Sequence, residues 1–186
     1  MSRIQDIAAE TMTDEQRRLF QQIAGPRGGV VRGPFAIWMH TPAIADRANA
    51  LGNVLRLEGK LDKKLFELAI LLVARHWTAQ YEWYVHEAPA LDAGVAPEAV
   101  EAIRAGRVPA FSDPAQQAVY RIVTELNESR ALAEPTYQLG VNALGQELLI
   151  ELISAMGFYT MVAIMLNAFD APVPGNARPL PSLDRN

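Results

Sequence analysis

The stretch ELAILLVARHWTAQYEWYVH, residues 67–86, decides the fold of this 186-residue chain. It begins as a nearly continuous apolar helical pattern that carries one carboxylate, Glu67, and it ends among aromatic residues, where Glu82 and His86 lie four positions apart. Residues at that spacing are neighbours on one face of a helix. On one continuous helix, at about 100° per residue, Glu67 would share a broad face with them but lie several turns away. A break near residues 77–79 would fold Glu67 back toward them.

Ionisable side chains are costly in an apolar helix unless they are paired or used in a reaction. We therefore interpret Glu67, Glu82 and His86 as a candidate site. Two simpler interpretations stay open. Glu82 and His86 could form an ordinary pair on a solvated helix face, and Glu67 could be an exposed carboxylate that the helix dipole favours near a helix start.

Helix start and stop signals divide the rest of the chain. The start signals are Thr13 with Gln16 as a capping box, Thr41-Pro42, Asp62, Pro97, Ser112-Asp113-Pro114 and Pro135. Strict alternation of polar and apolar residues never exceeds about four positions, which argues against strands. The pattern predicts an all-α fold of roughly seven or eight helices. We expect an N-terminal arm at residues 1–12, one helical domain at 13–170 and a proline-rich tail at 171–186.

Composition removes several classes of function. The net charge is −4 and the basic residues form no run, so no nucleic-acid partner is expected. The chain has no cysteine, which excludes disulfides, thiolate zinc sites and thiol chemistry. The segment Leu148–Phe169 is apolar and long, but its polar residues favour a buried helix over a membrane span. The sequence does not start with a cationic segment followed by an apolar one, which is the pattern of a secretory signal. We therefore expect a cytoplasmic protein.

Two residues outside the central stretch are candidates for binding a substrate. Arg32 lies in a glycine-rich loop and could pair with a substrate carboxylate, because a guanidinium matches a carboxylate with two hydrogen bonds. His40 precedes a helix start and could contact a substrate. The loop lacks the Gly-Lys-Ser/Thr ending of a phosphate-binding loop, and the three histidines lack the spacing of a zinc site. We therefore predict no cofactor and no metal.

Several segments resemble the carboxymuconolactone decarboxylase family, which includes alkyl hydroperoxidase D-like proteins. The most specific is Tyr81-Glu82-Trp83-Tyr84-Val85-His86, preceded by Glu67-Leu68-Ala69-Ile70-Leu71. Arg32-Gly33-Pro34-Phe35 with His40-Thr41-Pro42, and Phe158-Tyr159-Thr160-Met161-Val162-Ala163, are similar to its first and last segments. The resemblance covers roughly residues 27–169. It implies an all-α fold and self-association as a trimer or hexamer.

The resemblance also implies an acid–base site. In alkyl hydroperoxidase D-like proteins a glutamate is followed by a Cys-x-x-Cys pair and a histidine that form a proton relay. Counting back from His86, the two cysteine positions are Ala79 and Glu82, while Glu67 and His86 retain the glutamate and histidine. Thiol peroxidase chemistry is excluded, because no sulfur is present to attack a peroxide.

Together with the residues of the candidate site, the resemblance implies a cofactor-independent lyase that decarboxylates a small carboxylated lactone or organic acid in aromatic catabolism. Glu67, Glu82 and His86 are the predicted catalytic residues. His86 is the general acid/base, Glu82 orients it or shares its proton, and Glu67 is the second carboxylate of the relay. Arg32, His40, Trp77 and Tyr81 are the predicted substrate-binding residues. The alternatives are an isomerase or hydrolase that uses the same site, or a ligand-binding oligomer without activity.

Overall fold

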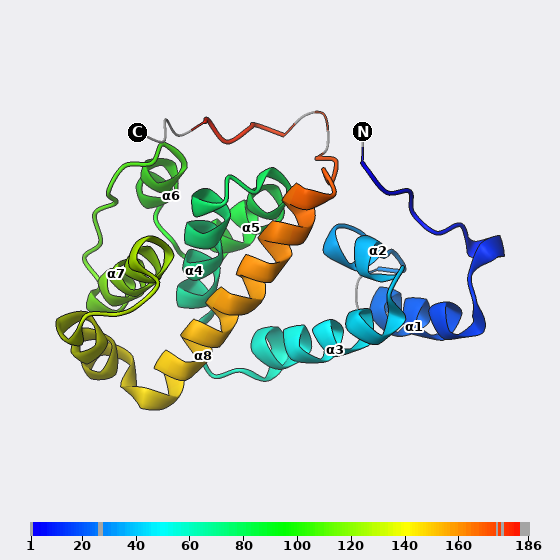
Figure 1. Cartoon of the computed structure of the whole chain (residues 1–186). Coiled ribbons are helices and arrows are strands. Elements are labelled where there is room, and N and C mark those ends of the chain that lie inside the picture. The colour runs from blue at the N-terminus through cyan, green and yellow to red at the C-terminus, as the bar shows by residue number, and fades with distance from the viewer. Residues whose placement is uncertain (1, 26–27, 174, 176, 183–186) are drawn as a thin grey trace. The chain divides into compact units, whose positions relative to one another are not determined.

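All regular secondary structure in the described part of the chain is helical. The computed structural model describes residues 2–25, 28–173, 175 and 177–182, and within them it has eight α-helices and no strand (Figure 1). The predicted all-α fold is confirmed. The helices fall into two compact units, Met1–Gly59 with Met165–Pro172, and Lys60–Ile164 with Val173–Asn186.

The first unit contains α1 (Asp14–Ala24), α2 (Pro34–Trp38) and α3 (Pro42–Asn53), which continues through a π-helical turn at Val54–Glu58. Helix α3 packs against α1 and α2. Thr13 caps α1 through the predicted capping box, in which the side chains of Thr13 and Gln16 each bond the other residue's backbone N–H. Thr41, the predicted cap of α3, makes no capping bond. Its hydroxyl instead donates to the carbonyl of Trp38.

The second unit is built around α4 (Lys63–His76), which begins at Asp62. The Asp62 carboxylate accepts the N–H of Lys64, as expected of a capping residue. Every residue of α4 from 65 to 75 is buried, because the helix packs against α5 (Gln80–Asp92), α6 (Pro97–Arg104) and α7 (Pro114–Ser129). This apolar helix is therefore the core of the unit. It also carries the buried carboxylate of Glu67.

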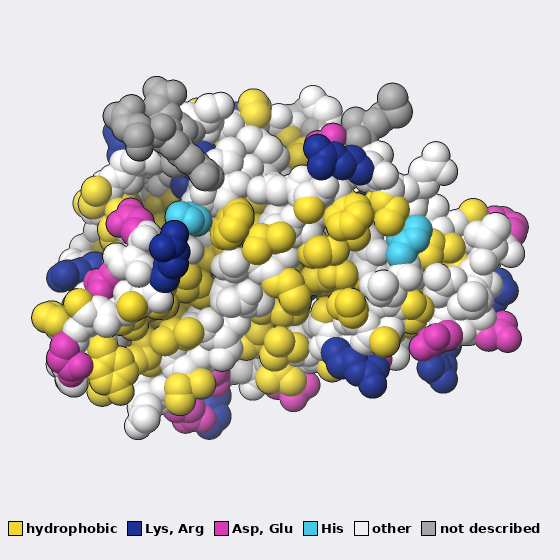
Figure 2. Space-filling model, in the orientation of Figure 1, with side chains coloured by type: hydrophobic (Ala, Val, Ile, Leu, Met, Phe, Trp, Pro, Cys, Tyr) yellow, Lys and Arg dark blue, Asp and Glu magenta, His cyan; other side chains and the backbone are white. Residues whose placement is uncertain are grey.

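Helix α8 (Glu134–Ala168) is interrupted at Gly145, whose φ of 79° is non-helical. Gly145 thus divides α8 into two helical segments joined by a kink. The later half packs on α4 through Tyr159, whose ring meets that of Phe66 edge-on at 5.7 Å. Part of its surface stays exposed, and Figure 2 shows apolar side chains gathered on the face along which α8 runs in Figure 1. The exposed apolar residues of this half are Ile150, Ile153, Met161 and Ile164.

Helix α8 is also, among the described residues, the one helix that is long and apolar enough to cross a membrane. Length and composition alone are weak evidence for a span, because core helices of soluble proteins share both properties. The buried side of α8 includes Leu149, Leu152, Phe158 and Val162. The prediction of a buried helix therefore describes one side of α8, whereas the other side is exposed.

Candidate functional site

A helical hairpin brings the candidate acid–base residues together. Helix α4 ends at His76 and α5 begins at Gln80. Of the two arrangements that the sequence left open, a continuous helix and a break at residues 77–79, the structure has the break. At about 1.5 Å per residue, Glu67 lies roughly 14 Å before the end of α4, and His86 roughly 9 Å after the start of α5. The two residues therefore meet when α5 folds back along α4, as the close packing of these helices requires.

Glu67 and His86 form a buried hydrogen-bonded pair. The distance between Oε2 of Glu67 and Nδ1 of His86 is 2.7 Å, and 6% of Glu67 and 8% of His86 remain exposed. An ionised carboxylate can only accept, so the imidazole donates from Nδ1. The lone pair of the neutral ring then lies on Nε2. Glu67 thus selects the tautomer of His86 and leaves Nε2 free to take up and return a proton.

Tyr159 of α8 fixes the ring of His86 from another direction. The two rings meet edge-on with their centroids 5.1 Å apart, and Tyr159 is itself held between Phe66 and Phe158. Its contribution to the site was not predicted from the sequence. The segment from Phe158 to Ala163 carried part of the family resemblance, but nothing in its spacing indicated contact with a histidine on another helix.

Glu82 is buried without any hydrogen-bonding partner. Its side chain is on α5, 1% of the residue is exposed, and neither carboxyl oxygen meets a donor among the described residues. Burial raises the pKa of Glu82 well above its usual range, because the charged form loses its hydration. Glu82 was predicted to orient His86. The structure instead pairs His86 with Glu67, and it leaves Glu82 buried without a hydrogen-bonding partner among the described residues.

The four predicted substrate-binding residues are divided between the two units. Trp77 and Tyr81 lie half-buried at the α4–α5 junction, in the same unit as Glu67 and His86. Arg32 and His40 are exposed residues of the other unit, where Nε2 of His40 lies 3.0 Å from the carbonyl oxygen of Gln5. Contact of any of the four with a substrate stays a prediction.

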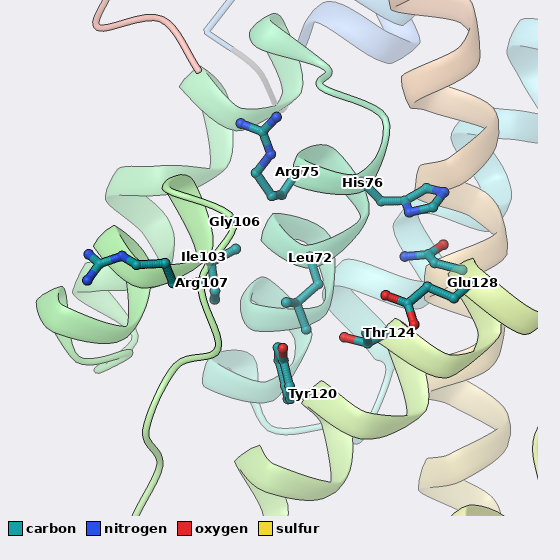
Figure 3. A pocket seen from close by; sticks show the side chains of 10 residues that line it. Leu72, Arg75, His76, Ile103, Gly106, Arg107, Tyr120, Thr124 and Glu128 are labelled. Atoms are coloured by element: carbon teal, nitrogen blue, oxygen red, sulfur yellow. The ribbon is translucent and has the colours of Figure 1, made fainter. Parts of the chain in front are cut away.

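A separate pocket of about 150 Å³ opens where the end of α4 meets α6 and α7 (Figure 3). None of its lining residues is Glu67, Glu82 or His86. They are Leu72, Arg75, His76, Ile103, Gly106, Arg107, Tyr120, Thr124, Asn127 and Glu128. Within the described chain, no group of three or more histidine, aspartate or glutamate side chains is placed to hold a metal ion.

Comparison with known families finds a match that includes the α4–α5 hairpin. The sequence model of the carboxymuconolactone decarboxylase family matches residues 42–125, a range that contains Glu67, Glu82 and His86. The resemblance seen in the sequence is therefore confirmed for the part of the chain that carries the buried pair. The chain itself has no cysteine.

A solved structure extends the likeness to the whole fold. The crystal structure of an uncharacterized peroxidase-related protein from Silicibacter sp. TM1040 superposes with a TM-score of 0.76, covering 95% of this chain and 93% of that one. The sequence identity is 17%, so the match shows a shared fold alone. No curated protein matches the chain.

Proposed function

We propose that this chain is a cofactor-independent lyase of the carboxymuconolactone decarboxylase family that removes CO2 from a small carboxylated lactone or organic acid. The observation that carries the proposal is the buried hydrogen bond between Glu67 and Nδ1 of His86. A histidine held in one tautomer by a carboxylate is a common arrangement for general acid–base catalysis. The family name supports a decarboxylation in particular, and the absence of cysteine removes the thiol route.

The proposed reaction needs one bond cleavage and one proton transfer. The bond between carbon and the substrate carboxylate breaks, CO2 leaves, and the electron pair moves into a conjugated carbonyl as an enolate. Protonated His86 then returns a proton from Nε2 to carbon, and the ring takes up another proton from water before the next turnover. Glu67 stabilises the imidazolium form in each cycle, because its carboxylate lies at Nδ1.

Glu82 has a different role in this proposal from the one its spacing suggested. As a neutral carboxylic acid it donates a hydrogen bond to the enolate oxygen, where negative charge develops. A neutral acid serves here because a carboxylate would repel the enolate, and the apolar surroundings that keep Glu82 protonated also strengthen the bond. Trp77 and Tyr81 form an aromatic wall for the substrate, and Arg32 and His40 are further candidates for substrate contacts.

The test is CO2 release with product analysis from purified protein, using a panel of carboxylated lactones, β-keto acids and vinylogous acids. We expect release that is lost in His86→Ala and retained in His76→Ala, which alters an exposed histidine on α4. Circular dichroism and thermal unfolding check that both variants fold. Release that His86→Ala leaves unchanged would refute the assignment.

Two alternatives are outcomes of the same experiment. Exchange of substrate C–H protons for deuterium without CO2 release would identify an isomerase that uses the same residues. Saturable binding of a small acid with neither signal would identify a ligand-binding protein. We also propose that the chain self-associates as a trimer or hexamer in the cytoplasm, which light scattering of the purified protein measures.

A further inference from the structure

Three helices of the second unit end in the same hydrogen-bonding pattern, but one of them uses an unusual residue. At the ends of α4, α5 and α6, the second residue after the helix is left-handed, and its N–H and the next N–H bond back to the last turn. The left-handed residue is Gly94 after α5 and Gly106 after α6, with φ of 94° and 67°. After α4 it is Thr78, with φ of 49°.

Threonine is a poor choice for this conformation. A branched Cβ crowds the backbone at positive φ, and such strain persists only where surrounding contacts hold it. Glycine would close the α4 end without strain, as it does after α5 and α6. Thr78 differs from glycine in offering a hydroxyl, and that hydroxyl accepts a hydrogen bond from Nη2 of Arg75 at 3.0 Å.

Arg75 is a buried arginine that forms no ion pair with an acidic side chain among the described residues. Only 5% of the residue is exposed, and its guanidinium donates to Thr78 and, at 3.3 Å, to the carbonyl oxygen of Arg104. Its Nε bonds to no described residue. Burial lowers the pKa of Arg75, and the nearby charge of Arg104 lowers it further. A buried guanidinium that forms no ion pair acts on the structure through the direction of its hydrogen bonds.

Arg75 lines the 150 Å³ pocket, but its guanidinium is directed elsewhere. In Figure 3 it is turned away from the side chains of Tyr120, Thr124 and Glu128. Its two hydrogen bonds join the α4–α5 junction to the end of α6. The contacts of Arg75 therefore indicate a part in shaping the hairpin.

Arg104 continues this connection to α5. Its side chain is 2% exposed, its guanidinium carbon lies 5.0 Å from the ring centre of Trp83, and its Nη2 donates to the carboxylate of Glu87. Trp83 and Glu87 directly follow Glu82 and His86 in the sequence. Arg104 thus holds one side of α5 at two points a helical turn apart, next to the side that carries the candidate site.

We propose that Thr78, Arg75 and Arg104 are positioning residues that set the rotation and angle of α5 against α4. The strained Thr78 fixes where α5 begins, Arg75 ties that point to the end of α6, and Arg104 prevents α5 from turning about its own axis. Together they keep Nδ1 of His86 at hydrogen-bonding distance from Glu67. The catalytic consequence rests on the proposed function, whereas the hydrogen bond itself is measured without substrate.

Thr78→Gly tests the proposal because relief of strain should preserve or raise the stability, whereas loss of positioning should weaken the hydrogen bond between Glu67 and His86. Glycine relieves the strained φ, so the thermal midpoint should stay the same or rise. The hydrogen bond to Arg75 is lost, so the Nδ1 proton of His86 should exchange with water about tenfold faster. This corresponds to a loss of about 1.4 kcal/mol in the free energy that protects the proton. NMR of 15N-histidine-labelled protein measures the exchange. Thr78→Ser keeps the hydroxyl and should retain the slow exchange. His86→Gln assigns the signal.

Arg130→Gly is the matched control, since Arg130 also has a positive φ, 63°, at the end of α7. It should leave the His86 signal unchanged. Glu87→Gln is a second test that loosens the hold of Arg104 without touching the junction, and it too should speed the exchange. Wild-type exchange in both folded Thr78→Gly and Glu87→Gln would overturn the proposal. Faster exchange would support it even if no substrate released CO2, so the two proposals fail separately.

Discussion

Glu67 and His86 lie 19 positions apart in the sequence, yet Oε2 of one is 2.7 Å from Nδ1 of the other in the interior of the protein. The bond spans two helices, so it exists only when the hairpin is formed. Local spacing favoured a different partner, Glu82, which is one helical turn from His86. The packing of α5 on α4 decides between the two carboxylates.

Glu67→Gln should lower turnover while preserving the fold. An amide can accept from Nδ1 but carries no negative charge, so the imidazolium form of His86 loses its stabilisation. We expect turnover to fall by roughly 10²–10⁴-fold, the range for loss of general acid–base catalysis. Steady-state kinetics on a substrate identified by CO2 release measures the change. Glu98→Gln, an exposed position on α6, is the control. Equal loss in both variants would contradict the role of Glu67.

Substitutions of Glu82 should separate its proposed hydrogen-bond donation from charge. Glu82→Gln keeps an N–H donor in a side chain of similar shape, whereas Glu82→Leu removes the donor. If Glu82 acts as a neutral acid, Glu82→Leu should cost roughly 10²–10³-fold in turnover, as loss of a donor to a developing oxyanion does, and Glu82→Gln distinctly less. Equal, large losses would instead indicate that the proton of Glu82 is itself transferred.

Glu82 should also make the protein less stable as pH rises. Burial raises its pKa, so above the ordinary value of about 4.5 the folded state keeps a proton that the unfolded state has lost. The free energy of unfolding therefore falls with rising pH, by up to about 1.4 kcal/mol per pH unit, until the folded-state pKa is passed. Subtracting urea unfolding curves of Glu82→Gln from those of wild type, at several pH values, isolates this slope. A flat difference would mean that Glu82 is not protonated in the fold.

Much of the secondary structure follows from local chemistry in the sequence. Asp62 begins α4 through a side-chain bond to a free backbone N–H, and α7 begins at Pro114 as the start signal Ser112-Asp113-Pro114 predicted. Gly145 interrupts α8 because glycine adopts its positive φ without strain. These features depend on residues within one or two turns, which is the range that sequence patterns report.

The site depends on longer-range contacts, and the sequence identified its residues better than their arrangement. Glu67, Glu82 and His86 stood out because ionisable groups are rare in apolar helices. Their pairing could not be predicted, because it requires the rotation of α5 against α4. The left-handed turn at Thr78, which sets this rotation, carries no signal in the sequence, because glycine is the residue expected at a left-handed helix end. Tyr159 could not be found either, because it reaches His86 from a distant part of the chain.

Two glycines of α8 should respond in opposite ways to the same substitution. Glycine in a helix interior is less favourable than alanine by about 0.5–1 kcal/mol. A Cβ at Gly157 would meet no atom within 4 Å, so Gly157→Ala should gain stability of that size. A Cβ at Gly140 would lie 2.9 Å from Cδ1 of Ile122 and 3.1 Å from Cδ1 of Leu149.

Ile122 and Leu149 are both buried, so neither can move aside freely. Overpacking of this kind costs about 1–3 kcal/mol, which exceeds the helix gain, and Gly140→Ala should therefore be destabilising. For a chain of this length, each kcal/mol corresponds to roughly 2–4 °C in thermal midpoint. Calorimetry of the two variants should place Gly157→Ala above wild type and Gly140→Ala below it. The reverse order would show that the first half of α8 does not pack against α7 at Gly140 as described.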